Sequence, residues 1–168
     1  MDAITALRNK RDTRSYTESE IDDETLKTVL DAARMAGSAK NVQPVRLVVV
    51  TDQAKQVALK ASGDFASWID TAPVVVVVTV RADAGPRSMF DVGRHSQNLM
   101  VAAHAVGLAS CPVTIHHPEV AHEALGIPDD VTPAMIVTLG WPAAAGAPSP
   151  IAGPRVDLGE YVDYEQWS

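Results

Sequence analysis

Hydrophobic and polar positions alternate along most of the chain with helical and strand periods. A helix that begins at the capping residue Asp22 has an apolar stripe on one face, and Gly37 is of the residue type that often closes a helix in the left-handed conformation. The run Val74–Val80 is continuous and β-branched, which is typical of a central strand buried on both faces. A long helix from about Met89 to Leu108 is apolar nearly all round, which is typical of a helix in a core or a subunit interface.

Shorter segments predict the remaining elements and one arm. The expected elements are a helix capped by Asp2, a helix capped by Asp52, a helix at Pro118–Leu125, and strands at Val45–Thr51, Cys111–Thr114 and Ala134–Leu139. Residues 143–168 begin rich in Ala, Pro and Gly and end with apolar and aromatic residues. We therefore expect residues 1–168 to form a single domain, with 143–168 as an arm that packs on a partner subunit.

Composition and charge narrow the class of protein. The chain has 168 residues, of which 46% are hydrophobic and 21% charged, as is usual for one globular domain. Its formal net charge of -7 argues against a general nucleic-acid binder, and no apolar run is long enough to span a membrane. The single cysteine and the absence of a signal-peptide pattern at the start make a cytoplasmic location the default expectation.

A polar loop precedes the first predicted strand. Between Gly37 and Pro44 it offers one hydroxyl, one ammonium and two carboxamides, from Ser38, Lys40, Asn41 and Gln43. Pro44 favours extended geometry at the preceding residue. Such a loop suits hydrogen bonding to a polar heterocycle, although the same side chains often satisfy only the backbone of their own turn.

Cations occur in a basic run, Lys10–Arg14, and again at Arg155 in the arm. If these side chains converge, they suit a phosphate group, because each charge-assisted hydrogen bond contributes roughly 1.5–3 kcal/mol. The alternative is that they belong to unrelated solvated faces.

The common catalytic and metal motifs are absent from the sequence. There is no Gly-x-Gly-x-x-Gly, Walker loop or Gly-x-Ser-x-Gly elbow. The one metal-like group matches no standard ligand spacing, so we expect no metal site; it consists of His116, His117, Glu119, His122 and Glu123. Cys111 is expected to be a buried core residue, and His95 and His104 to be satisfied core or interface residues.

A series of motifs in the right order resembles the FMN-dependent nitroreductase family. They are Lys10-Arg11-Asp12-Thr13-Arg14-Ser15-Tyr16, the segment Ala32–Pro44, Asp91-Val92-Gly93 with Gln97-Asn98-Leu99, Gly107–Pro112, Leu139-Gly140-Trp141-Pro142 and Pro154–Leu158. The resemblance implies an α+β, nitroreductase-like fold with a central, mostly antiparallel sheet flanked by helices. It also implies a homodimer with FMN in the interface, in which the C-terminal arms are exchanged.

The same resemblance implies a flavin oxidoreductase. Hydride would pass from NADH or NADPH through flavin N5 to a nitroaromatic compound, a quinone or a similar small acceptor, with no catalytic side-chain nucleophile. Arg14 would stabilise negative charge near N1 and O2 of the reduced flavin.

Family residues carry over to ten positions as cofactor-binding candidates. Lys10 and Arg155 would face the phosphate, Arg11 and Asp12 the phosphate and ribityl chain, and Arg14 the pyrimidine edge. Ser38, Asn41 and Gln43 would line the flavin from the other subunit, while Thr114 and Ile115 would lie by N5 with a backbone N–H aimed at it.

Departures from the family pattern keep alternatives open. Asp12 stands where serine is usual, Val45 where tryptophan is usual and Gly37 where proline is usual. The region Arg81–Met89 lacks the excursion that covers the substrate site in longer relatives, which predicts an open acceptor pocket. The alternatives are a non-catalytic flavin-binding protein for storage or sensing, a flavin-fragmenting enzyme like dimethylbenzimidazole synthase, and a site for a deazaflavin. The sequence does not distinguish NADH from NADPH.

Overall fold

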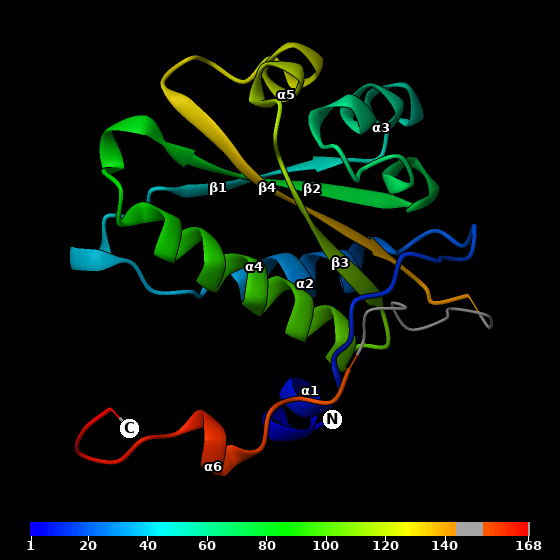
Figure 1. Cartoon of the computed structure of the whole chain (residues 1–168). Helices are drawn as coiled ribbons and strands as arrows, with labels where there is room; N and C mark the ends of the chain where they lie inside the picture. The colour runs from blue at the N-terminus through cyan, green and yellow to red at the C-terminus, as the bar shows by residue number, and fades with distance from the viewer. Residues whose placement is uncertain (144–152, 168) are drawn as a thin grey trace.

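The computed structural model describes residues 1–143 and 153–167, and a four-stranded sheet lies at its centre (Figure 1). The strands are β1 (Val45–Val50), β2 (Val74–Arg81), β3 (Ala109–Thr114) and β4 (Val131–Gly140), in the order β1-β2-β4-β3. All three strand pairs are antiparallel. This arrangement confirms the expected α+β class with a mostly antiparallel sheet.

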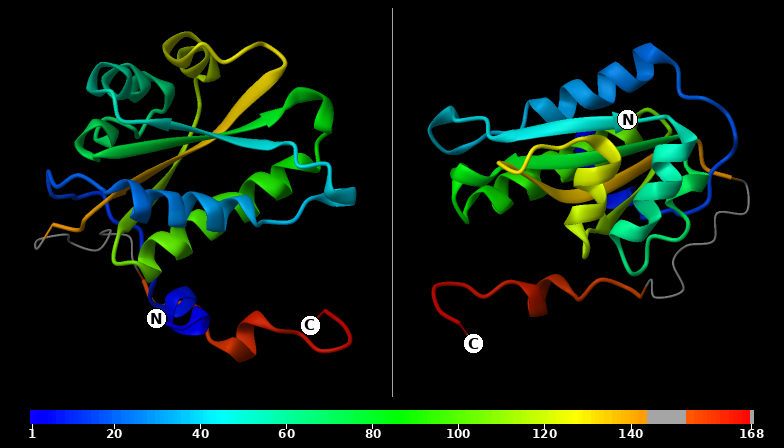
Figure 2. Two further views of the ribbon diagram at one scale, coloured as in Figure 1. Left: turned by 180° about the vertical axis from the view of Figure 1, so that it is seen from behind. Right: turned by 90° about the horizontal axis from the view of Figure 1, so that it is seen from above.

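Helices cover both faces of this sheet (Figures 1 and 2). One layer contains α2 (Asp23–Arg34) and α4 (Ser88–Ala105), and the other contains α3 (Gln53–Leu59) and α5 (Pro118–Leu125). Successive valines of β2 alternate between the layers: Val76 shares a core cluster with Leu99 of α4, and Val77 shares one with Leu59 of α3. The prediction that this strand is buried on both faces is confirmed.

Three helices begin at the aspartates that the sequence indicated. In α1 (Ala3–Asn9), α2 and α3, the carboxylates of Asp2, Asp22 and Asp52 accept the backbone N–H of the third residue that follows, at 2.9–3.1 Å. These bonds satisfy backbone donors that have no partner within the first helical turn. Short 3-10 turns occur at Ala39–Asn41, Lys60–Ser62, Ile69–Thr71 and Ala82–Ala84.

The long helix α4 packs into the core, as expected. Val92, Leu99 and Ala103 are fully buried against the sheet and α2. The helix ends at Ala105, and Gly107 takes a positive φ of 90°, which a glycine adopts without steric cost. Across residues 1–143 and 153–167, no helix combines the length and the apolar character that a membrane span requires.

Two expectations about the loop between α2 and β1 are wrong. α2 ends at Arg34, and the backbone of Gly37 does not take a positive φ. The space beside Gly37 is instead filled by the guanidinium of Arg94, 3.5 Å from where a Cβ would lie. Gln43, which precedes a proline, has a φ of 50° rather than an extended conformation. The loop curls there because the hydroxyl of Ser38 accepts the N–H of Gln43 at 2.8 Å.

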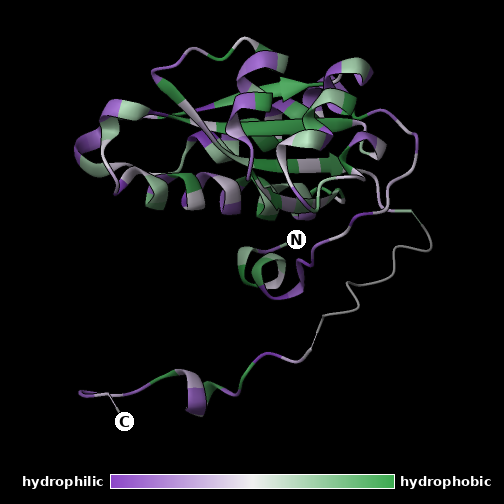
Figure 3. Ribbon diagram, turned by 45° about the horizontal axis from the view of Figure 1, so that its top comes forward, coloured by the Kyte–Doolittle hydropathy of each residue, from purple (hydrophilic) through white to green (hydrophobic). Residues whose placement is uncertain are grey.

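The described part of the C-terminal arm, residues 153–167, runs away from the sheet and contains the short helix α6 (Leu158–Tyr161) (Figures 1 and 3). Residues 144–152 and 168 of the predicted arm lie outside the described residues. Large apolar side chains along the arm are 63–91% exposed: Val156, Leu158, Tyr161, Tyr164 and Trp167. Within this chain the arm therefore does not bury its apolar residues, and its packing on a partner stays a prediction.

Candidate functional site

The basic N-terminal segment lies along the outer edge of the sheet. Asp12 pairs with Ser110 of β3 in a parallel bridge, and the Thr13 N–H donates to the Ser110 carbonyl oxygen at 3.0 Å. Because β3 is the last strand of the sheet, this pairing sets Lys10–Arg14 beside its free edge. Four of the candidate residues, Lys10, Arg11, Asp12 and Arg14, therefore belong to one segment beside β3.

Lys10 is held by two neighbours at this edge. Its ammonium forms an ion pair with Asp12 and lies 3.2 Å from the Met100 sulfur of α4. The Lys10 side chain is only 10% exposed, whereas that of Asp12 is 49% exposed. The negative charge of Asp12, the residue that departs from the family pattern, is therefore balanced by Lys10.

Arg11 points to the end of α1. Its guanidinium donates to the carbonyl oxygens of Arg8 at 2.7 Å and Lys10 at 2.9 Å. These are carbonyls at the C-terminal end of the helix, where a positive charge is favourable. Arg11 itself remains exposed.

Arg14 lies over an aromatic ring that sequence reasoning missed. Its guanidinium carbon is 5.4 Å from the centre of the Trp68 ring, a cation–π contact. Burial raises the pKa of the Cys111 thiol on β3, and the nearby charge of Arg14 acts in the opposite direction. Arg14 therefore lies between β3 and the Phe65–Trp68 turn. The spacing of Arg14 and Trp68 along the chain does not predict this contact.

The far end of β3 has a backbone edge that faces away from β4. Along a strand, the backbone N–H and C=O groups of every second residue point to the same side. The carbonyl of Ser110 points away from β4, so the backbone groups of Pro112 and Thr114 should point away from β4 as well. Pro112 has no N–H, which leaves Thr114 as the next donor along this edge. Thr114 is exposed, while Ile115 packs against the core cluster beneath α3 and α5.

A neighbouring turn supports this end of the strand. Ser62 O accepts the N–H groups of His116 at 2.8 Å and His117 at 3.0 Å. A Cβ on Gly63 would lie 2.7 Å from the Thr114 carbonyl oxygen, so only glycine permits this approach. The turn therefore fixes Thr114 and Ile115 in place.

Ser38, Asn41 and Gln43 form a separate group. Gln43 donates through its side-chain nitrogen to the Asn41 carboxamide oxygen at 3.1 Å. Lys40, Asn41 and Gln43 have φ values of 51°, 55° and 50°, a conformation that residues other than glycine adopt only at an energetic cost. Three such residues in four positions mark a strained loop, which is a common feature of ligand sites.

This loop and the basic segment lie toward opposite ends of α4 (Figures 1 and 2). Arg94, near the start of α4, donates to the Gly37 carbonyl oxygen and to Asp91 at 2.8 Å, whereas Lys10 contacts Met100 further along the same helix. One chain therefore does not bring the two groups of candidates together. Arg155 is exposed in the arm.

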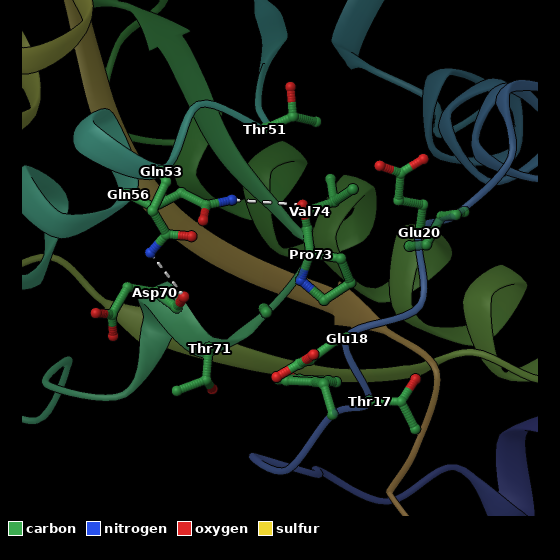
Figure 4. A pocket seen from close by; sticks show the side chains of 13 residues that line it. Thr17, Glu18, Glu20, Thr51, Gln53, Gln56, Asp70, Thr71, Pro73 and Val74 are labelled. Atoms are coloured by element: carbon green, nitrogen blue, oxygen red, sulfur yellow. Dashed lines mark hydrogen bonds between the residues drawn. The ribbon is translucent and has the colours of Figure 1, made fainter.

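A large cavity of about 790 Å³ is not the candidate site. It opens between residues 16–21 and the start of β2, and it contains none of the ten candidates (Figure 4). Three carboxylates, from Glu18, Glu20 and Asp70, line it, so its charge is unfavourable for a phosphate. Within it Gln53 and Gln56 donate to the carbonyls of Asp70 at 3.2 Å and Pro73 at 3.5 Å.

The histidines do not form a metal centre in the part of the chain that the structure describes, where no group of three or more His, Cys, Asp or Glu side chains is arranged to hold an ion. His117 Nε2 lies 3.0 Å from an Asp64 carboxylate oxygen. His95 is buried with Nδ1 2.8 Å from the Asp91 carbonyl oxygen, as expected for a satisfied core residue. The buried Nε2 of His104 has no partner among the described residues, and its expected place at a subunit interface stays a prediction.

Comparison with known proteins gives a consistent result. The model of the nitroreductase family matches residues 7–67 and 62–141. A relative named NADH dehydrogenase from Thermus thermophilus is 28% identical, over 89% of this chain and 91% of its own length. A relative named FMN reductase [NAD(P)H] from Bacillus subtilis is 25% identical, over 89% of this chain and 69% of its own.

Solved structures agree with the sequence comparison. The crystal structure of a nitroreductase family protein from Clostridium difficile 630 superposes with a TM-score of 0.86 at 27% identity, covering 99% of this chain and 100% of the other. The Bacillus megaterium protein NfrA2 gives 0.88 at 25% identity, covering 100% of this chain and 76% of the other. With a family match across most of the sequence and the fold reproduced in full, this chain belongs to the nitroreductase family.

Proposed function

We propose that the protein is an FMN-dependent oxidoreductase that takes hydride from NADH or NADPH and passes the electrons to a nitroaromatic compound, a quinone or a similar small acceptor. The observation that carries the proposal is the basic segment Lys10–Arg14 beside the outer edge of β3, with Thr114 further along the same strand. Relatives named NADH dehydrogenase and FMN reductase support the class of reaction.

The residues at this edge fit the chemistry of FMN. Lys10 and Arg11 supply positive charge for a phosphate. The buried hydroxyl of Ser110 beside them has no partner among the described residues, and an unpaired buried polar group of this kind fits a site that a ligand completes. Arg14 has its planar guanidinium over Trp68, which suits the polar edge of a flat heterocycle.

FMN, when bound, would supply the redox chemistry, which is the transfer of electrons from the nicotinamide to the second substrate. The chain's own residues would bind and orient the cofactor. Arg14 would hold the pyrimidine edge of the cofactor and stabilise negative charge there. Thr114 offers a backbone N–H at the outer edge of β3, fixed by the turn at Gly63.

A second copy of the chain would complete the site. Ser38, Asn41 and Gln43 lie toward the other end of α4 from the cations, so they would reach the same flavin from the partner subunit. The exposed apolar side chains of the arm, such as Leu158 and Trp167, would be buried on that partner together with Arg155 near the phosphate.

Anaerobic absorption spectroscopy tests this proposal. The purified protein reconstituted with FMN should show flavin bands that bleach with NADH or NADPH and return when a quinone is added. Arg14→Ala should bind FMN more weakly and be reduced more slowly, whereas Arg34→Ala, which removes an exposed arginine of α2, should behave like the wild type. Bound flavin that neither nicotinamide reduces would replace the proposal with the storage or sensing function, and failure to bind FMN would reject it.

A further inference from the structure

The hydroxyl of Tyr16 lies at the junction between the basic segment and the sheet. It donates to the Thr13 carbonyl oxygen at 2.6 Å and lies 2.6 Å from the Thr138 hydroxyl of β4. Thr138 in turn is 3.2 Å from the carbonyl oxygen of Cys111 on β3. One side chain therefore connects the segment that carries the cations to both strands at the end of the sheet.

The direction of the hydrogen bonds at Tyr16 and Thr138 follows from which atoms can donate. A carbonyl oxygen only accepts, so the single proton of the Tyr16 hydroxyl goes to Thr13. The Thr138 proton is then shared between the Cys111 carbonyl and the Tyr16 oxygen. Burial raises the pKa of the Tyr16 hydroxyl, so it stays a donor throughout the pH range in which the protein is handled.

The ring of Tyr16 is held as firmly as its hydroxyl. A Cβ on Gly140 would lie 2.7 Å from Tyr16 Cδ1 and 2.7 Å from Pro73 Cδ, so the ring packs where only glycine leaves room. The backbone of Tyr16 bridges to Pro142, and the Thr17 N–H donates to Trp141 O at 2.9 Å. A rigid ring on the sheet thus presents its hydroxyl to the carbonyl that immediately precedes Arg14.

We propose that Tyr16 is a positioning residue for the flavin site: its hydroxyl fixes the Thr13 peptide and so directs Arg14 toward the pyrimidine edge of the cofactor. This inference rests on the proposed function. Thr13 is clamped on both sides, since its N–H donates to Ser110 O and its carbonyl accepts from Tyr16. Without the hydroxyl, the second clamp is lost and the peptide that carries Arg14 is free to turn.

The test compares oxidised and reduced flavin. Tyr16→Phe keeps the ring and removes only the hydroxyl. Because Arg14 acts mainly on the negative charge of reduced flavin, the variant should weaken binding of reduced FMN about tenfold more than binding of oxidised FMN. A tenfold difference lowers the midpoint potential of the bound flavin by about 30 mV for a two-electron couple. A merely structural role would not change this ratio.

Two further variants make the experiment decisive. Thr138→Val removes the neighbour of the hydroxyl but leaves Thr13 O as acceptor, so the potential should fall in the same direction by a smaller amount. It carries the test if Tyr16→Phe does not fold. Thr28→Val deletes a hydroxyl on the surface of α2 and should leave the potential unchanged.

An unchanged potential in Tyr16→Phe, or equal weakening of oxidised and reduced FMN together with a lower unfolding temperature, would overturn the proposal. If the wild type itself binds no FMN, the proposed function fails instead, so the two failures are distinguishable.

Discussion

Asp12 gives the sharpest prediction, because this carboxylate pairs with a lysine that a phosphate would need. Asp12→Asn keeps the shape of the side chain and removes its charge. Lys10, which is 10% exposed and in contact with Met100, has little room to move away and would become available to the phosphate. We therefore expect tighter binding of FMN.

The magnitude follows from Coulomb's law. A phosphate that touches Lys10 from outside would lie about 6 Å from the Asp12 carboxylate, where the repulsion in water is about 0.7 kcal/mol for each phosphate charge. The dielectric constant of water is appropriate because Asp12 is 49% exposed and screened by solvent. For a dianion the total is about 1.4 kcal/mol, so the dissociation constant of FMN should fall about tenfold at low salt.

Riboflavin, which lacks the phosphate, supplies the control ligand. Titration by quenching of flavin fluorescence should show tighter FMN binding in Asp12→Asn, unchanged riboflavin binding, and a gain that shrinks as salt screens the charges. Asp31→Asn removes an equal charge from an exposed ion pair of α2 and should change neither affinity. Weaker FMN binding in Asp12→Asn would refute the reasoning and would indicate that the carboxylate holds the ribityl hydroxyls instead.

Three further predictions concern the same end of the sheet. Arg14→Lys should bind FMN better than Arg14→Ala but less tightly than the wild type, because an ammonium keeps the charge and loses the planar fork; titration with FMN compares them. Gly140→Ala should destabilise the fold by about 1–3 kcal/mol through overpacking against Tyr16 and Pro73, measured by urea unfolding. Burial raises the pKa of the Cys111 thiol in the folded protein above its value in the unfolded chain. The free energy of unfolding is therefore unaffected by this thiol below the unfolded-state pKa, and it falls as pH rises from there through the folded-state pKa. Cys111→Ala should therefore lose less stability than the wild type on moving to alkaline pH, and equal losses in urea unfolding would contradict this.

Local signals made most of the fold predictable. Aspartate caps mark the starts of α1, α2 and α3, and the valine run marks the buried strand β2. The conformation of Gly37 was not predictable in this way, because Arg94, far along the sequence in α4, packs beside it and donates to its carbonyl oxygen. Gln43 departs from the usual rule before proline because the Ser38 hydroxyl captures its N–H.

The sequence indicated candidate residues for the site, whose binding roles stay predictions, but it did not indicate their contacts. The order of motifs indicated Lys10–Arg14 and Thr114, and the structure places both on the outer edge of β3. The pairing of Lys10 with Asp12 and the contact of Arg14 with Trp68 depend on how the irregular segment Lys10–Arg14 lies against β3. Periodicity along the chain carries no information about such contacts.

We propose that each flavin site joins the basic segment of one subunit to the polar loop of the other. Mixed dimers test this arrangement directly. One preparation carries Arg14→Glu in the basic segment, and the other carries Asn41→Glu in the polar loop. After subunit exchange, about half of the dimers are mixed and each mixed dimer has one unaltered site, so about one quarter of the sites should recover FMN-dependent NAD(P)H oxidation. Recovery to that level from two inactive variants is the predicted result. No recovery, with exchange shown by differently tagged subunits, would contradict a site shared between two chains.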